Sequence, residues 1–321
     1  MWMGDSRYPG GITNGHWENL CGGDGFWVFP DPSDASYVYA ESQSGEIGRE
    51  NRFRLEARTI KPQPNYGEGK LRFNWNTPIH LSPNEKGAIY VGAQFLFRSH
   101  NHGQSWERIS PDLTTNDLEK QKQEESGGVT VDNVDNSDAE IHTTIYSIGE
   151  SPRDGQTIWV RTDDGNLQVT RDGAKSWTNV VGNVPNLSKA SWVSRVEASL
   201  HDASTAHATF DLHTFGEMEP HVFRTTDYGK TCVPIVTADS GVRGYAHVIK
   251  EDTVLLRPAQ SVSIREQQAS ILRMGGAELV IEGCRPGKVF GEMALLSPAA
   301  RQDQTFSASK QDGIWGRVRG D

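Results

Sequence analysis

Glu292 and Arg301 lie nine residues apart near the end of this 321-residue chain and have side chains suited to a cyclic phosphate. A short helix opening at Gly291 would point backbone N–H groups and the positive end of its dipole toward such an anion. The Glu292 carboxylate can accept a hydrogen bond from a ribose hydroxyl, and the Arg301 guanidinium can pair with phosphate oxygens. The alternative is a turn and a short helix with an apolar face.

A second chemistry to consider is glycoside hydrolysis, which needs two facing carboxylates or, in sialidases, a tyrosine nucleophile and an arginine cluster. Asp24 and Glu41 supply carboxylates, but an Asp between glycines is ordinarily a turn former. The arginines are scattered along the chain, which is typical of solvated surface. They are Arg49, Arg52, Arg72, Arg98, Arg161, Arg171 and Arg195. The sequence therefore favours no catalytic role.

Metal binding is weakly indicated. Asp132, Asp135 and Asp138 bring oxygen donors together, but their segment lacks the Gly and the closing Glu of a calcium loop. A solvated acidic loop is the simpler interpretation. His142 stands in a β-prone run, so we expect it to pack in a strand and not to bind a metal. We expect no metal and no cofactor, with cAMP or cGMP as a candidate ligand of the C-terminal segment alone.

One eight-residue motif occurs three times, as SHNHGQSW, TRDGAKSW and TTDYGKTC. Each copy has Ser or Thr first, Asp or Asn third, Gly fourth or fifth and Ser or Thr seventh. These types suit a β-hairpin turn, because Gly tolerates positive φ and the third side chain can bond backbone amides two residues on. We assign this structural role to Ser99, Asn101, Gly103, Trp106, Thr170, Asp172, Gly173, Trp177, Thr225, Asp227 and Gly229.

A second repeated element, a turn followed by a β-prone run, precedes these motifs. Its markers Pro32, Pro83, Pro152 and Ala203 are 51, 69 and 51 residues apart, close to the length of a four-stranded propeller blade. The middle interval is longer because residues 112–139 are almost wholly polar and cannot form a blade. We expect this segment to be an inserted loop with a short helix near 116–122.

Composition limits the class of protein. Hydrophobic residues make up 35%, Gly is abundant at 33 and Trp at 9, which favours short strands and many turns. The formal net charge is −10, so no basic field exists to collect nucleic acid. No run reaches the roughly 18 apolar residues of a membrane helix. The three widely spaced cysteines exclude a disulfide-dense scaffold and a Cys-x-x-Cys knuckle; they are Cys21, Cys232 and Cys284.

The repeated motif resembles the Asp-box, or bacterial neuraminidase repeat, and the resemblance extends over about 8–254. Stretches such as LRFNWNTPIHLSP and EIHTTIYSIGESP are similar to bacterial sortilin-type propellers named as BNR-repeat glycosyl hydrolases. The resemblance implies a secreted propeller of more blades than the four present here, usually without hydrolase activity. The Trp residues of such propellers either stack on glycans or fill the core between blades; candidates are Trp75, Trp159 and Trp192.

Residues of about 260–315 resemble a different family, the cyclic-nucleotide-binding domain, around PGKVFGEMALLSP. The resemblance implies a phosphate-binding cassette formed by Gly291, Glu292, Ala294, Arg301 and Thr305. The chain departs from that family because Gln302 stands three residues before the Thr, where relatives have Arg. The segment also has about half the residues that the jelly roll of this family needs.

We therefore predict an all-β chain with a partial β-propeller of about four blades over 1–255 and a small C-terminal β/α fragment, resembling the cyclic-nucleotide jelly roll, over 256–321. The expected function is a non-catalytic interaction module for a protein, peptide or glycan on the propeller face. The alternatives are a cyclic-nucleotide sensor and a sialidase-like glycoside hydrolase. Relatives of the two parts belong to different compartments, so localisation stays open and a truncated or fused chain is expected.

Overall fold

The structure of the chain is a computed structural model. Its described residues fall into two compact units, one of Met1–Glu150 with Asp154–Asn179 and the other of Ser151–Arg153 with Val180–Asp321. No helix in the described part is long and apolar enough to cross a membrane. The described residues are 2–4, 11–54, 56–121, 141–187, 193–236, 244–252, 269–272 and 277–282.

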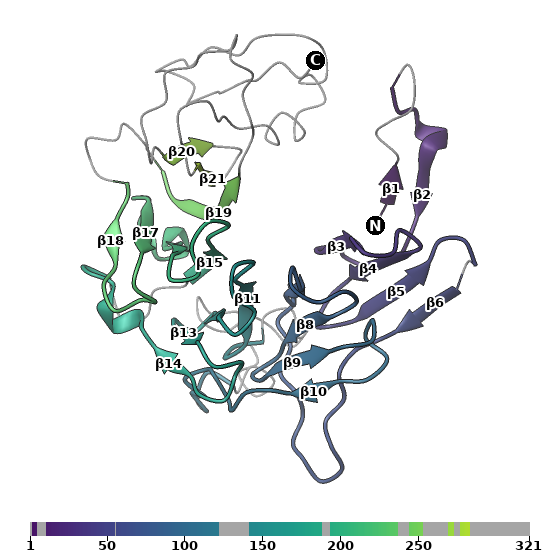
Figure 1. Cartoon of the computed structure of the whole chain (residues 1–321), viewed down its shortest axis with the longest axis horizontal. Coiled ribbons are helices and arrows are strands. Elements are labelled where there is room, and N and C mark those ends of the chain that lie inside the picture. The colour runs from purple at the N-terminus through teal and green to yellow at the C-terminus, as the bar shows by residue number, and fades with distance from the viewer. Residues whose placement is uncertain are drawn as a thin grey trace. The chain divides into compact units, whose positions relative to one another are not determined.

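Four sheets share one architecture, an antiparallel meander of four strands in chain order (Figure 1). This is the strand order of a propeller blade, and it confirms the all-β fold with four-stranded repeats that the sequence predicts. Sheet 1 contains β3 (Val28–Pro30), β4 (Tyr37–Glu41), β5 (Ile47–Asn51) and β6 (Glu56–Thr59). Sheet 2 contains β7 (Ile79–Leu81), β8 (Ile89–Gly92), β9 (Leu96–Ser99) and β10 (Glu107–Arg108). Sheet 3 contains β11 (Ile145–Glu150), β12 (Ile158–Thr162), β13 (Leu167–Thr170) and β14 (Thr178–Asn179). Sheet 4 contains β15 (Val193–Ala198), β16 (Ala206–Phe210), β17 (His221–Thr225) and β18 (Val233–Pro234).

The other described strands do not follow this plan. A two-stranded pair joins β1 (Trp2–Gly4) to β2 (Trp17–Asn19). A three-stranded sheet places β19 (Ala246–Asp252) parallel to β21 (Ala277–Glu282), which in turn pairs with β20 (Ala269–Leu272). The predicted boundary at residue 255 lies outside the described residues and stays a prediction. Short 3-10 helices are η1 (Asn14–His16), η2 (Val181–Asn183) and η3 (His213–Phe215).

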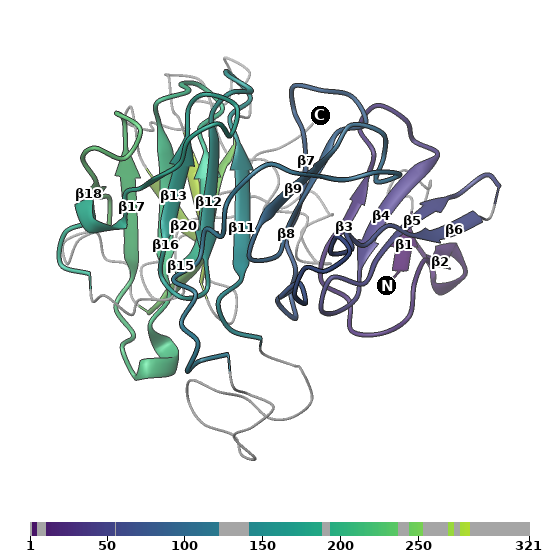
Figure 2. The same cartoon turned by 90° about the horizontal axis from the view of Figure 1, so that it is seen from below.

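Burial changes across each sheet. Every residue of β8, β12 and β16 is buried, whereas β10, β14 and β18 are exposed along their whole length. A strand buried on both faces reads as a continuous apolar run, and Ile89–Gly92 in β8 is such a run. These three strands have only two residues each, which limits their use as edges for unwanted pairing, whereas the exposed last strand of sheet 1, β6, has four. Figure 2 shows β11, β12 and β13 of sheet 3 side by side.

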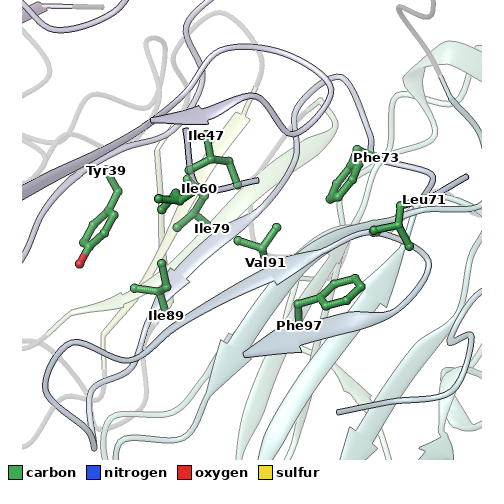
Figure 3. Packing of buried hydrophobic residues seen from close by; sticks show 10 residues of the cluster. Tyr39, Ile47, Ile60, Leu71, Phe73, Ile79, Ile89, Val91 and Phe97 are labelled. Carbon is green, nitrogen blue, oxygen red and sulfur yellow. The ribbon is translucent and has the colours of Figure 1, made fainter. Parts of the chain in front are cut away.

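Within the first unit, sheets 1 and 2 pack through a shared apolar core (Figure 3). Ile47 of β5 meets Ile79 of β7 and the alternating pair Ile89 and Val91 of β8. Burying one such aliphatic side chain contributes about 1.5–3 kcal/mol. The cluster is completed by residues on the connections and neighbouring strands, Tyr39, Ile60, Leu71, Phe73, Ala93 and Phe97.

The helix predicted near 116–122 is wrong for its described part. Residues 118–121 form a turn. The Asp117 carboxylate accepts hydrogen bonds from the backbone N–H groups of Glu119 and Lys120 at 3.0 and 3.3 Å. Asn116 has a φ of 52°, which a helix does not permit. A side chain that binds the next N–H groups this way competes with helix formation.

Candidate functional site

The two ends of each sheet differ in the turns that they carry. In a meander, the turns between strands one and two and between strands three and four emerge at one end, and all other connections emerge at the opposite end. In sheet 2 the first end carries 82–88 and the Asp-box 99–106, and we call it the box end. The opposite end of sheet 2 carries 93–95 and the connection 60–78, and we call it the loop end.

The three boxes form the same hydrogen-bond network. The first-position hydroxyl donates to the third-position side chain at 2.9 Å in each box and accepts the N–H of the fifth residue at 2.8–3.0 Å. The third side chain accepts the N–H of the seventh residue at 2.9–3.0 Å, four residues on and not two as expected. In the first box, Asn101 replaces Asp and its amide donates to Ser105 Oγ, so the contact survives with the donor reversed. Hydrogen bonds from Ser176 lower the pKa of Asp172 to about 2.

The displaced glycine of the second box has a conformational explanation. Positions four and five are both left-handed in every box. Gly173 and Ala174 have φ of 70° and 74°, and Tyr228 and Gly229 have 60° and 80°. Either position therefore gains from glycine, which tolerates positive φ without steric cost.

The first and third boxes each pack against an aliphatic residue that follows the last strand of the preceding sheet, Ile60 and Val180 respectively. Trp106 Nε1 donates to the carbonyl of Ile60 at 2.7 Å. Trp177 and Ile109 pack on one apolar cluster, and Asn183 near Val180 donates to the carbonyl of Gly229 at 2.7 Å. The box residues thus have contacts with their own turns and with neighbouring sheets, and we propose that their role is structural.

Most predicted ligand sites fall outside the described residues. The cassette Gly291, Glu292, Ala294, Arg301 and Thr305 lies there, and so do Asp132, Asp135, Asp138 and Trp192. The nucleotide prediction stays a prediction. In the described part, no group of three or more His, Cys, Asp or Glu side chains could hold a metal ion. Trp159 is fully buried and belongs to the core, whereas Trp75 is half-buried in a loop.

A polar cluster occupies the loop end of sheets 2 and 3, and Asn74 lies at its centre. The Asn74 amide donates to Thr144 Oγ1 at 3.0 Å and to Asp163 Oδ2 at 3.3 Å. Asn74 Oδ1 accepts the N–H of Asn76 at 3.0 Å. Asp163 also accepts the N–H and the hydroxyl of Thr144 at 2.9 and 2.7 Å. Side chains from three separate connections are therefore fixed against one another.

Arg72 connects Asp112 and Thr143 to this cluster. Its Nε donates to the carbonyl of Thr143 at 3.1 Å, and its Nη2 forms an ion pair with Asp112 at 2.8 Å. Asp112 begins the predicted inserted loop and Thr143 follows it. His142, expected in a strand, lies in the bend just before β11. The chain therefore passes next to the cluster at Asp112 and again at Thr143.

Asn76 and Tyr146 extend the cluster. The Asn76 amide donates to Tyr146 Oη at 3.4 Å, and the Arg161 guanidinium lies 5.7 Å from the centre of the Tyr146 ring. Asn76 Oδ1 and His142 Nδ1 are buried without a hydrogen-bond partner among the described residues. A buried polar atom without a partner costs about 1–3 kcal/mol, and a hydrogen bond from a water molecule or a ligand would remove this cost.

The carboxylates of the cluster are already occupied. Burial raises the pKa of Asp163 to about 6, although the nearby His142 opposes the rise. Asp164 accepts the N–H and hydroxyl of Thr115 at 2.6 and 2.7 Å and a hydroxyl hydrogen bond from Thr162. These bonds hold loops in place. The arrangement can present amide and hydroxyl groups to a ligand, and its acids are engaged as acceptors.

The second unit has a different cluster, in which Asp211 bridges two imidazoles. His213 Nδ1 lies 2.5 Å from Asp211 Oδ1, and His247 Nδ1 lies 2.7 Å from Oδ2. The His213 ring stacks on Tyr245 with 4.3 Å between ring centres. Burial alone would raise the pKa of Asp211, but hydrogen bonds from His247 and His213 outweigh it and lower the pKa. An ionised carboxylate only accepts, so both histidines donate through Nδ1.

Sequence reasoning singled out neither Asn74 nor Asp211. Both stand in connections rich in Asn, Asp and Thr, whose common role is to form turns. The available signal was the polar, Trp-containing segment Leu71–Pro78 between two β-prone stretches. That segment was used only for its resemblance to propellers.

No protein-family model matches the chain, and no curated protein matches it. Three of the solved structures that are similar to this chain show the range of sequence identity and coverage. An ancestral GH74 enzyme has 17% identity over 73% of this chain and 26% of its own, with a TM-score of 0.45. An auxiliary nutrient binding protein from Bacteroides thetaiotaomicron VPI-5482 has 8% identity over 67% and 42%, with a TM-score of 0.40. YCF48 bound to D1 peptide has 15% identity over 52% and 47%, with a TM-score of 0.29. The chain spans between about a quarter and a half of the lengths of these structures, and such likenesses bear on the fold alone.

Proposed function

We propose that the chain is a non-catalytic binding module that takes a neutral glycan at the loop end of sheets 2 and 3. The buried Asn76 Oδ1 carries this proposal, because it lies in a cluster of fixed polar groups and has no hydrogen-bond donor among the described residues. Each Asn amide both donates and accepts, which matches the hydroxyl groups of a sugar. The half-buried Trp75 adds an aromatic ring of the kind that sugars pack against.

The occupied carboxylates support binding over hydrolysis. Glycoside hydrolysis requires one carboxyl group to transfer a proton and a second to act as nucleophile or base. Both oxygens of Asp163 accept hydrogen bonds from Thr144 and Asn74, and both oxygens of Asp164 are likewise engaged. The hydrogen bonds of Asp163 and Asp164 with loop residues are consistent with carboxylates that hold the loops in position.

A panel of immobilised neutral oligosaccharides and peptides, probed with the purified full chain, tests this proposal. The best oligosaccharide is then titrated calorimetrically into the wild type, Asn76→Ala and the matched control Asn84→Ala at the box end of sheet 2. We expect Asn76→Ala to weaken binding about tenfold or more, the control to bind as the wild type does, and the sugar to be recovered intact. Binding of peptides alone, hydrolysis of the sugar or equal affinities of the two variants would overturn it.

A further inference from the structure

The box end of sheet 1 gathers arginine side chains that the loop-end cluster does not use. A pocket of about 180 Å³ opens there. Three guanidinium groups and one carboxylate contribute to its lining, which includes Arg49, Arg54, Arg58, Glu56, Tyr37 and Asn51. The ionised side chains of this lining therefore sum to a positive charge.

Arg49 is held rigidly in this pocket. The residue is only 7% exposed, although an arginine is seldom buried so far. Its Nη1 donates to the carbonyl of His102 at 2.8 Å, and its guanidinium carbon lies 5.1 Å from the centre of the Tyr37 ring. These contacts fix the plane of the guanidinium, so little conformational entropy is lost when an anion binds.

Arg58 and Arg54 bring further positive charge close to Arg49. Arg58 lies directly opposite Arg49 across β5 and β6, and like charges in that relation are destabilising. Arg54 stands on the turn between these strands, where Asn51 Oδ1 accepts its N–H at 3.0 Å. Among the described residues, no ion pair engages any of the three arginines. A bound anion would remove this repulsion.

We propose that this pocket binds an oxyanion, the sulfate, phosphate or carboxylate group of an anionic ligand. Guanidinium groups pair with such groups through two parallel hydrogen bonds, and charge-assisted bonds of this kind are about twice as strong as neutral ones. The pocket is independent of the glycan proposal, because it lies at the opposite end of a different sheet.

The test is calorimetric titration of the full chain with inorganic sulfate, inorganic phosphate, acetate, and a sulfated disaccharide with its desulfated counterpart. The variants are Arg58→Gln, Glu56→Gln and the control Arg171→Gln, which makes the same charge change in the second box. We expect the wild type to prefer the sulfated disaccharide, Arg58→Gln to weaken oxyanion binding about tenfold, and Glu56→Gln to strengthen it. Arg58→Gln should also raise the melting temperature of the ligand-free chain, because it removes the repulsion with Arg49.

The control decides between a pocket and a general charge effect. An inorganic ion that binds as well as the disaccharide supports the pocket and identifies the oxyanion as the whole ligand. The absence of binding by every probe overturns the proposal. Equal losses in Arg58→Gln and Arg171→Gln also overturn it, because net charge alone would then explain the binding.

Discussion

Gly229 lies so close to Val180 that a Cβ atom on the glycine would stand 2.7 Å from Val180 Cγ2. Gly103 of the first box has the same relation to Ile60, at 2.5 Å from Cδ1. The first and third boxes therefore pack closely on an aliphatic side chain at a position where the box residue has no Cβ atom. This contact explains why glycine at the fifth box position serves packing as well as turn conformation.

Gly229→Ala is expected to lower the free energy of unfolding by roughly 1–3 kcal/mol, from left-handed strain and overpacking against Val180. The matched control is Ala174→Gly, which changes the same box position in the opposite direction. Because Ala174 already has a φ of 74°, its replacement should stabilise the chain by up to about 1 kcal/mol. Urea unfolding measures the free energy of unfolding of both variants. A lower value for Ala174→Gly than for the wild type would contradict the assignment of strain to this position.

Asp172→Asn should retain most of the stability at neutral pH, because Asn101 makes the equivalent contacts in the first box. The acid response should differ. The folded-state pKa of Asp172 is lowered to about 2 from an ordinary 3.8, so its stabilisation is complete above about pH 4 and is lost as pH falls toward 2. Between pH 7 and pH 2.5, the melting temperature of the wild type should fall further than that of Asp172→Asn. An identical fall would show that the carboxylate contributes nothing.

Glu41 is fully buried, with one oxygen accepting the N–H groups of Gly45 and Thr77 at 3.4 Å each and the other without a partner among the described residues. Burial raises its pKa to about 8. The folded chain then keeps a proton that the unfolded chain releases above about 4.5, so stability should decline as pH rises from 4.5 to 8. Glu41→Gln should remove up to about 1.4 kcal/mol per pH unit of this decline. Unfolding curves at pH 5 and pH 8 that change equally in both proteins would refute the prediction.

Asp211→Asn should destabilise the second unit by about 1–3 kcal/mol, because an amide cannot accept the Nδ1 protons of His213 and His247 with both of its polar atoms. The expected signature is a tautomer change. In the wild type both rings donate to Asp211 through Nδ1, and nitrogen NMR should show that one ring has changed its hydrogen-bonding nitrogen in the variant. Unchanged ring signals would mean that Asp211 does not set the tautomers. Because the pKa of Asp211 is lowered in the folded chain, its contribution to stability is present above about pH 4 and is lost in stronger acid.

The repeats were predictable because their information is local. A box such as Thr170–Trp177 bonds within itself, and β-prone runs such as Ile158–Thr162 carry their own pattern, so four sheets of four strands follow from the chain alone. The hydrogen bond between the Asp172 carboxylate and the N–H of Ser176 was not predicted. A bond to the N–H two residues on, which was expected, belongs to a tighter turn. The fold of the C-terminal segment stays a prediction.

The site could not be predicted because its contacts are long-range. Asn74 meets Asp163 across 89 residues, and Arg49 meets His102 across 53. Asn, Asp and Thr in a connection suit both a turn and a binding surface, and only their convergence separates the two roles. Arg49 was ranked with scattered surface charge for the same reason, because its position opposite Arg58 depends on the register of β5 and β6.

Whether the loop end of sheets 2 and 3 binds the ligand is tested most directly by NMR titration with the tightest-binding neutral oligosaccharide. The side-chain amide signals of Asn74 and Asn76 and the indole signal of Trp75 should shift on binding. The amide signals of Asn84 and Asn101 at the box end should stay in place. Shifts confined to the box end, or none at saturating oligosaccharide, would contradict a binding site at the loop end.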